Sequence, residues 1–415
     1  MKNRMLGVAV IVLLGTAQRS PAEPGNWPQW RGPDRTDLSA ETGLLQSWPE
    51  GGPKRVWLNE DIGLGYSGPA IMDGQLYIMG ARGEKEFLLA LDAADGRELW
   101  AVEIGELLKN NWGDGPRGTP AVDGQYVYAL GGHGNLVCAL RADGTVRWTK
   151  SMKDLGGKLP NWGYTESPLV DGDHVICTPG GEQGAVAALN KLTGEPVWQS
   201  KEFKDGAQYA SIMPIAHDGQ RQYVQLTMKH VVGLNPQTGE VLWTSDWPGR
   251  TAVIPTPIYA QGQVYVTSGY GVGCKLIRLN GTPQPEEVYA NKNMKNHHGG
   301  VILLKGNLYG YSDNVGWLCQ DFETGEEVWS EKKPLGKGAI AYADGQFYCL
   351  DESSGDVVLI DASPEGWNER GRFTIEPQTE LRKPSGRIWT HPVIVDGRLY
   401  LRDQELLFCY DVKAP

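Results

Sequence analysis

The chain has 415 residues, a formal net charge of -11, and a composition rich in Gly (55), Trp (15) and Tyr (17). An acidic chain lacks the basic stripe that phosphate backbones require, so the charge argues against nucleic acid as a partner. The many glycines and aromatic residues favour short strands joined by tight turns over helices.

The N-terminal segment has the pattern of an export signal. Lys2 and Arg4 precede an apolar run over residues 5–15, which is too short to span a bilayer but suits the hydrophobic part of a signal peptide. We expect cleavage after Ala22, with cleavage after Ala17 as the second choice and an uncleaved anchor as the alternative. The sequence therefore predicts a periplasmic or secreted protein with no other helix that crosses a membrane.

Two phrases repeat along the rest of the chain. The first is an apolar strand, an Asp-Gly turn or a relative of it, and an alternating strand; its copies begin at residues 67, 118, 166, 211, 255, 299, 338 and 390. Asp-Gly between apolar runs is a strong hairpin signal, because both turn residues need positive φ. The second phrase ends in an aromatic residue, at Trp100, Trp148, Trp198, Trp243, Tyr289, Trp329 and Phe373. A period of roughly 40 to 50 residues is typical of one propeller blade.

These repeats predict an all-β, eight-bladed β-propeller of four-stranded antiparallel blades over residues 54–415, after a signal peptide at 1–22 and a lead-in at 23–53. The last repeat contains only three strands. We expect residues 54–57 to supply its fourth strand and so close the ring. The aromatic residue at the end of each fourth strand is expected to pack on the neighbouring blade.

The cysteines form no CxxC pair, and Cys138, Cys319 and Cys409 lie in apolar strand patterns. Their spacing is not that of a disulfide framework, even in an exported protein. Most are therefore predicted to be buried free thiols. They are Cys138, Cys177, Cys274, Cys319, Cys349 and Cys409.

The second phrase, as in LNKLTGEPVW ending at Trp198, resembles the tryptophan-docking repeat of the pyrroloquinoline-quinone-like propeller superfamily. That superfamily includes quinoprotein alcohol dehydrogenases and the propeller lipoprotein of the bacterial outer-membrane assembly machine. The opening NWPQWRGPDRTDLS also resembles the lead-in of many secreted bacterial members. The resemblance covers nearly all of the mature chain and implies the fold, but a fold does not determine its chemistry.

In such a propeller, the segments that lead into the innermost strands converge on one face and form a funnel, which is the default ligand site. Polar and aromatic side chains occupy these segments here. The candidate ligand-binding residues are Tyr66, Arg117, Trp162, Glu166, Tyr209, His297, His298, Lys337, Arg387, Trp389 and His391. No catalytic residue and no metal ligand is assigned.

Several of these candidates have two interpretations. Adjacent His297 and His298 would point to opposite faces of an extended strand, so at most one is expected to face the funnel. Glu166 either pairs with an arginine of the neighbouring blade, Arg117, or acts as an acid or base. Trp162 and Trp389 either stack a planar ligand or sugar, or pack the edge of a blade.

The resemblance raises the question of a quinone cofactor. In the dehydrogenases, the quinone lies between a tryptophan and a disulfide of two adjacent cysteines, beside a calcium ion held by Glu, Asn and Asp oxygens. This chain has no adjacent cysteines and no CxxCH haem motif, and Glu166 and Asn296 are the calcium donors that can be suggested. The site for pyrroloquinoline quinone with calcium is incomplete, and the cofactor stays unassigned.

Three functions remain open from the sequence. The first is a non-catalytic exported propeller, monomeric, that binds a protein, peptide or carbohydrate ligand through its funnel or an exposed strand edge. The second is a quinone-dependent dehydrogenase of an alcohol, polyol or sugar. The third is a metallohydrolase that uses His297 or His298 together with His391. The first is favoured because intact blade repeats accompany an incomplete cofactor set.

Overall fold

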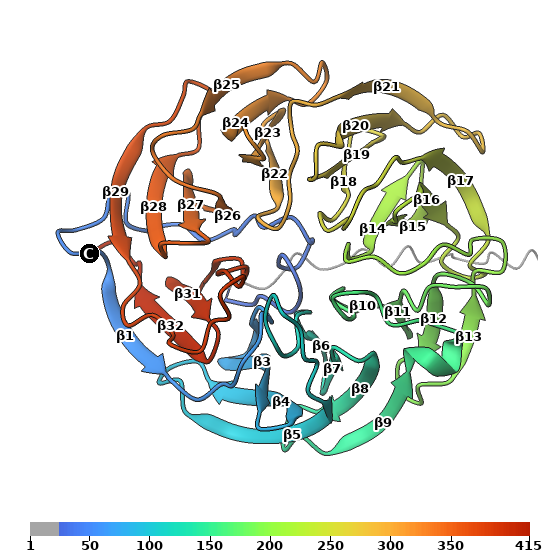
Figure 1. Ribbon diagram of the computed structural model, residues 1–415, viewed down its shortest axis with the longest axis horizontal. Helices are drawn as coiled ribbons and strands as arrows, with labels where there is room; N and C mark the ends of the chain where they lie inside the picture. Colours follow the sequence, from blue (N-terminus) through green and yellow to red (C-terminus); the bar gives the residue numbers. More distant parts are fainter. Residues whose placement is uncertain (1–24) are drawn as a thin grey trace, which may run out of the picture.

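The computed structural model describes residues 25–415, so the predicted signal peptide lies outside the described residues. The strands of this part form eight four-stranded antiparallel sheets around one axis (Figure 1). The eight-bladed propeller predicted from the repeats is confirmed. The one helix described, η1(Met152–Leu155), is a short 3-10 turn, and no described helix has the length and apolar character to cross a bilayer.

Each blade contributes one strand to each of four concentric positions. The innermost strands are β2(Ala70–Met72), β6(Ala121–Asp123), β10(Leu169–Asp171), β14(Met213–His217), β18(Ile258–Ala260), β22(Val301–Leu304), β26(Gly338–Ala343) and β30(Val393–Val395). The second strands are β3(Gln75–Arg82), β7(Tyr126–Leu130), β11(His174–Cys177), β15(Gln220–Leu226), β19(Gln263–Ser268), β23(Asn307–Ser312), β27(Gln346–Asp351) and β31(Arg398–Asp403). The third strands are β4(Lys85–Asp92), β8(Asn135–Leu140), β12(Ala187–Asn190), β16(His230–Leu234), β20(Gly273–Arg278), β24(Gly316–Asp321), β28(Asp356–Asp361) and β32(Leu406–Asp411). The outermost strands are β5(Glu98–Glu106), β9(Val146–Ser151), β13(Pro196–Gln199), β17(Val241–Asp246), β21(Glu286–Asn291), β25(Glu327–Glu331), β29(Glu369–Thr374) and β1(Lys54–Asn59).

The ring closes as the sequence predicts. The eighth blade has the strand order β1-β32-β31-β30, so its outermost strand comes from the beginning of the propeller and its other three strands from the end. Figure 1 shows β1 beside β32, next to the C-terminus. This pairing leaves no blade with a missing strand, and it joins the two ends of the repeat array by backbone hydrogen bonds.

The hairpins between the first and second strands explain the repeated Asp-Gly phrase. In six of the eight blades both turn residues have positive φ, as in Asp73 (52°) and Gly74 (73°). Such turns match the twist of the flanking strands. Blades two and three differ, because there the aspartate is the last residue of the innermost strand. Only the glycine that follows it, Gly124 in blade two and Gly172 in blade three, has positive φ. The same phrase therefore supports two hairpin geometries.

The aromatic residue at the end of each outermost strand joins neighbouring blades. The indole N–H of Trp148 donates to the carbonyl of Lys191 in the next blade at 2.9 Å, and Trp100 makes the same bond to Arg141 at 2.9 Å. A glycine lies directly beneath the indole: a Cβ on Gly194 would be 2.7 Å from the ring of Trp148. Docking on the neighbouring blade is thus confirmed for Trp100 and Trp148, whereas the indole N–H of Trp243 donates to Gln222 of its own blade at 2.8 Å.

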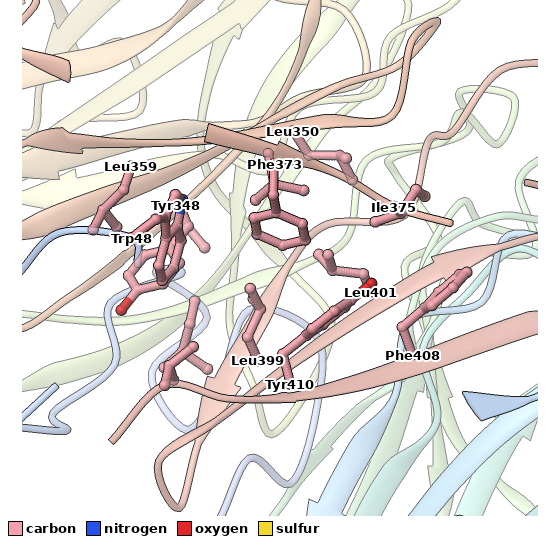
Figure 2. Close-up of a cluster of buried hydrophobic side chains, with 14 of the residues drawn as sticks. Trp48, Tyr348, Leu350, Leu359, Phe373, Ile375, Leu399, Leu401, Phe408 and Tyr410 are labelled. Atoms are coloured by element: carbon pink, nitrogen blue, oxygen red, sulfur yellow. The ribbon is translucent and has the colours of Figure 1, made fainter. Parts of the chain in front are cut away.

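The core lies between adjacent blades and consists of interdigitated apolar side chains. Figure 2 shows one such layer, between blades seven and eight, to which the lead-in adds Trp48. The ring of Trp48 makes edge contacts with Tyr348 and Phe373, with centroids 5.6 and 5.7 Å apart. All six cysteines are free and buried, as expected.

The lead-in, residues 25–53, begins in the middle of the ring and then runs out to the rim near β29 and β1 (Figure 1). The buried guanidinium of Arg35 donates to the backbone carbonyls of Ile212 (2.6 Å), Ser167 (3.0 Å) and Pro168 (2.7 Å). These carbonyls belong to blades three and four, next to their innermost strands. Because they are buried near the axis, they need a donor that the blades themselves do not supply.

A second buried arginine ties the lead-in to the opposite side of the ring. Arg31 donates to the carbonyl of Val301 at 2.6 Å and forms an ion pair with Asp37 at 2.6 Å. Nδ1 of His391, in blade eight, lies 3.1 Å from the same carboxylate. Burial alone would raise the pKa of Asp37, but Arg31 and then His391 hold it below its ordinary value. Buried charged side chains of the lead-in and of blade eight therefore hold the lead-in in place near the axis.

Candidate functional site

A cavity of about 440 Å³ lies on the axis, at the face of the ring where the blades connect to one another. All eight connections into the innermost strands contribute to its wall. Two loops between second and third strands also contribute to the wall, because these loops lie at the same end of the blades as the connections. Its aromatic lining consists of Trp30, Tyr66, Trp112, Trp162, Tyr209, Tyr270 and Trp389. The volume is in the range of small-molecule sites in proteins, about 300–1,000 Å³.

The lead-in closes the inner end of this cavity. Trp30 donates its indole N–H to Thr256 Oγ1 at 2.9 Å, and its ring lies 4.7 Å from that of His391. Arg31 borders both the cavity and a smaller one of about 190 Å³ that Arg35 lines. The axis is therefore a blind funnel, open at one face and floored by lead-in side chains.

A continuous wall of flat groups follows one side of the funnel. The guanidinium of Arg117 lies 5.1 Å from the centre of the Tyr66 ring, and Tyr66 lies 5.1 Å from Trp389. Trp389 stacks on His298 at 4.5 Å and 26°, and His298 lies 3.7 Å from His297. The indole N–H of Trp389 also donates to Glu352 at 3.1 Å.

The charges at the wall are strongly affected by burial. Burial, followed by the charge of Lys337, lowers the pKa of His297 to about 3, and burial lowers that of His298 well below its usual value. Burial raises the pKa of Glu352 to about 7. Both imidazoles are therefore neutral at pH 7. Four cationic side chains and the carboxylate of Glu352 line the cavity, and two of the cations are paired with the buried or half-buried aspartates Asp37 and Asp313.

Ten of the eleven residues predicted from the sequence line this cavity, and Glu166 is the exception. Its carboxylate turns into blade three and accepts the backbone N–H of Thr178. The ion pair with Arg117, one of the two interpretations of Glu166, is not formed, and Arg117 donates instead to the carbonyl of Gly113 at 2.6 Å. Thr165 and Ser167 line the cavity, so alternation along an extended segment directs the intervening Glu166 into the blade.

The expectation that at most one of His297 and His298 faces the funnel is also wrong. Both line it, because this segment is a bent loop before β22 and not a strand. Nζ of Lys337 lies 2.8 Å from Nδ1 of His297 and 2.7 Å from Asp313. The ammonium donates to Nδ1, which places the imidazole proton on Nε2.

Sequence reasoning missed Trp30, Trp112, Tyr270 and Glu352. The phrase Asn-Trp-Gly occurs at both 111–113 and 161–163, so the choice of Trp162 could have pointed to Trp112. The other three carry no such signal. Tyr270 and Glu352 lie in loops between second and third strands, and Trp30 lies in the lead-in.

The residues present do not fit a calcium-dependent quinone. Calcium takes about six to eight oxygen ligands, including carboxylates. Of the residues that the structure describes, Glu352 is the one carboxylate that lines the cavity. Glu166 and Asn296 do not line it, and the amide N–H₂ of Asn296 is bonded to the carbonyls of Gly300 and Tyr311. Among residues 25–415, no three His, Cys, Asp or Glu side chains gather as a metal-binding group.

The histidines do not assemble a metal site either. Nδ1 of His391 faces Asp37, and its Nε2 lies 2.8 Å from the carbonyl of His298. Both ring nitrogens of His391 are thus held by protein acceptors, and neither is free to bind a metal jointly with His297 or His298.

The fold and the cavity define a quinoprotein-like, eight-bladed propeller with a ligand-sized blind funnel on its axis. A family model described as "Outer membrane protein assembly factor BamB" matches residues 84–331, which is more than half of the chain. The protein belongs to this family.

Individual relatives are distant. Outer membrane protein assembly factor BamB of Yersinia pestis is 24% identical over 234 residues, which cover 52% of this chain and 55% of that protein. Tetrathionate hydrolase of Acidianus ambivalens is 32% identical over 120 residues, 26% of this chain and 22% of that protein. The chain thus spans about half or less of the length of these curated relatives.

Two solved structures show the same fold at low identity. BamB from Moraxella catarrhalis has 16% identity and a TM-score of 0.59, with 84% of this chain and 95% of that chain covered. Quinohemoprotein alcohol dehydrogenase from Comamonas testosteroni has 13% identity and a TM-score of 0.63, with 94% and 81% covered. One neighbour is named an assembly factor and the other an enzyme, so the likeness shows the fold alone.

Proposed function

We propose that this protein is an exported, non-catalytic binding protein that holds a carbohydrate chain in its central funnel. One observation carries the proposal: all eight blade connections and the lead-in build a single blind cavity lined by seven aromatic rings. Flat indole and phenol faces suit the apolar faces of sugar rings, and ordered polar groups between them give specificity.

The proposal is supported by what the cavity contains besides the aromatic rings. Among the described residues, Glu352, whose pKa burial raises to about 7, is the one acidic side chain that lines the cavity, and no second lining carboxylate forms the pair that most glycoside hydrolases use. The calcium donor set of a quinone dehydrogenase does not fit either. A binding role is also in keeping with the name of the Yersinia pestis relative, an assembly factor.

Export is part of the proposal and rests on the pattern of residues 2–22, a basic start followed by a short apolar run and small residues. A protein outside the cytoplasm meets polysaccharides as chains with accessible ends. The funnel opens at one face and is closed at the other by Trp30 and Arg31. That shape fits the end of a chain and not a strand that passes through the ring.

Calorimetric titration of the purified protein with cellotetraose, mannotetraose and tetragalacturonate tests the proposal. We expect at least one of them to bind with a stoichiometry of one. Replacing both Trp162 and Trp389 by Ala should weaken that binding at least tenfold, about 1.4 kcal/mol. The exposed turn residue Leu192, replaced by Ala, is the control and should leave the affinity unchanged.

A second measurement addresses catalysis directly. The protein is mixed with pyrroloquinoline quinone, calcium and a redox dye, and alcohols, polyols and sugars are added. We expect no substrate-dependent dye reduction. Reduction that disappears in the Trp162→Ala/Trp389→Ala double variant would show a dehydrogenase in the funnel and would overturn the non-catalytic proposal.

A further inference from the structure

Arg117 forms no ion pair within residues 25–415, and the two carboxylates that act on it electrostatically, Glu86 and Asp114, lie beyond salt-bridge distance. Its Nη2 donates to the carbonyl of Gly113 at 2.6 Å, and its Nε is buried without a partner. The centre of the Tyr66 ring lies 5.1 Å from the guanidinium carbon of Arg117. A half-buried guanidinium without a counter-ion is costly, and a bound anion offsets that cost.

The other cations of the cavity differ from Arg117. Arg31 is paired with Asp37, and Lys337 with Asp313, at 2.6 and 2.7 Å. Arg387 donates to the backbone carbonyls of Pro384 and Gly386. Glu352 interacts electrostatically with both Lys337 and Arg387. Arg117, which lies against Tyr66 at one end of the aromatic wall, is therefore the lining cation best placed to pair with an anionic ligand.

The opposite end of the same wall presents neutral, unpaired nitrogens. Nδ1 of His297 accepts from Lys337, so its Nε2 carries the proton, and this Nε2 is buried without a partner. Nδ1 of His298 is buried and unpaired as well. Both side chains line the cavity, so a ligand with hydroxyl groups can satisfy them.

The wall between these two ends is flat and apolar. It consists of Tyr66, Trp389 and the His298 ring, in successive contact at 5.1 and 4.5 Å. The distribution is thus a cation at one end, aromatic faces in the middle, and neutral hydrogen-bonding nitrogens at the other end. The complementary ligand carries an anionic group, a flat apolar face and hydroxyl oxygens within one small unit.

From this arrangement we infer that the funnel binds an acidic polysaccharide through a uronic acid residue, whose carboxylate pairs with Arg117. The sugar ring lies against Tyr66 and Trp389, and a hydroxyl oxygen accepts the Nε2 proton of His297. A guanidinium offers two parallel donors to a carboxylate, which a neutral sugar cannot use. The inference rests on the proposed function and specifies its substrate class.

Two probes with the same backbone test the inference: tetragalacturonate and its fully methyl-esterified form, which keeps the shape and removes the charge. We expect calorimetry to show at least tenfold tighter binding of the acid, and this preference should weaken as salt is raised. Arg117→Gln should reduce the preference to about that of a neutral ligand, whereas Arg117→Lys, which retains the charge, should keep part of it.

The controls separate folding from recognition. Arg147→Gln, at an exposed position on β9 outside the cavity, should leave both affinities unchanged. Thermal unfolding of each variant shows whether Arg117→Gln is folded, and the Arg117→Lys result stands even if it is not. Equal binding of the acid and the ester to the wild-type protein would overturn the inference.

The failures of the two proposals are distinguishable. If cellotetraose or mannotetraose binds in the funnel and tetragalacturonate does not, the carboxylate assignment is wrong and the carbohydrate proposal stands. If none of the saccharides binds, both are wrong. Binding of a small tricarboxylate such as citrate as tightly as tetragalacturonate would show an anion site without sugar recognition, which also overturns the inference.

Discussion

Nζ of Lys337 lies 2.8 Å from Nδ1 of His297, and this contact determines which nitrogen of the imidazole carries the proton. The two residues come from the connections into blades six and seven and are 40 positions apart in the chain. Because Lys337 also pairs with Asp313, its donor is held in place, and the N–H at Nε2 of His297 is buried without a protein partner beside the funnel.

This contact predicts that His297 stays neutral, with its proton on Nε2, from pH 8 to pH 5. Burial, with the charge of Lys337 second, lowers its pKa to about 3. Lys337→Met should raise that pKa, but burial should still hold it below 6.5. Nitrogen chemical shifts of ¹⁵N-histidine-labelled protein measure both quantities, with exposed Lys204→Met as the control. A protonated ring, or an Nδ1–H tautomer, at pH 5 in the wild-type protein would contradict the prediction.

Glu352 predicts how the affinity for an acidic ligand depends on pH. Burial raises its pKa to about 7, so it is negative above pH 7 and neutral below it. The carboxylates of tetragalacturonate stay ionised throughout this window. Binding should therefore tighten as the pH falls from 8 to 6, on the order of threefold to tenfold, because a repulsive charge is lost. Glu352→Gln should bind with the same affinity at both pH values. Weaker binding of tetragalacturonate to the wild-type protein at pH 6 than at pH 8 would contradict the prediction.

Glu166 predicts a pH dependence of stability. Its carboxyl is fully buried, and burial raises its pKa to about 7, above the 4.5 of a free glutamate. The folded protein thus binds more protons than the unfolded chain between these values. Its contribution is fully present below about pH 4.5 and is lost as the pH rises through 7, by at most about 3 kcal/mol.

The measurement is the difference between two denaturation series, one of the wild-type protein and one of Glu166→Gln, from pH 5 to pH 8. Glu352 changes both series alike, so it cancels in the difference. We expect the variant to gain stability relative to the wild-type protein as the pH rises. A constant difference would show that Glu166 is ionised throughout.

The glycine beneath the docked indole of Trp148 predicts a matched pair of variants. Gly194 (φ +73°) and Gly219 (φ +76°) have similar backbones, but a Cβ on Gly194 would meet Trp148 at 2.7 Å, whereas one on Gly219 meets nothing within 4 Å. Gly219→Ala should cost about 1–2 kcal/mol from backbone strain alone. Gly194→Ala should cost about 1–3 kcal/mol more, from overpacking. Equal free energies of unfolding for the two variants, measured in urea, would show that the ring of Trp148 moves aside without an energetic cost.

The lead-in predicts a large loss of stability when Arg35 is removed. Its guanidinium satisfies three buried carbonyls of two blades. Arg35→Ala should lower the free energy of unfolding by about 3 kcal/mol or more, because it leaves these acceptors without a donor. Arg97→Ala, at a side chain 62% exposed, should change it by less than about 0.5 kcal/mol. A change below 1 kcal/mol for Arg35→Ala would show that water replaces the guanidinium.

Much of the architecture could be predicted because it depends on short sequence patterns that recur along the chain. Asp-Gly turns, alternating strands and a terminal Trp each act within a few residues, and their repetition predicts the number of blades. The closure by residues 54–57 followed from counting strands. The position before an innermost strand is always at the same end of the ring, and so ten of the eleven candidate residues reached one cavity.

The failures come from side-chain direction, which depends on the path of each connection. Thr165 and Ser167 face the cavity, so Glu166 faces the blade; a one-residue difference in register would have reversed this. His297 and His298 share a face because their segment bends before β22. The pairing of Lys337 with His297, and not with a carboxylate alone, depends on the distance between two blades, which no local pattern contains.

By itself, the amino-acid sequence determined the class of fold, the number of blades, the strand that closes the ring and the burial of the cysteines, since each follows from short-range periodicity. Only the tertiary structure decided that the lead-in floors the axis, that Glu166 leaves the site, and that Trp30, Tyr270 and Glu352 join it. These depend on contacts between residues up to several hundred positions apart, as between Asp37 and His391, and such contacts exist only once the ring has closed.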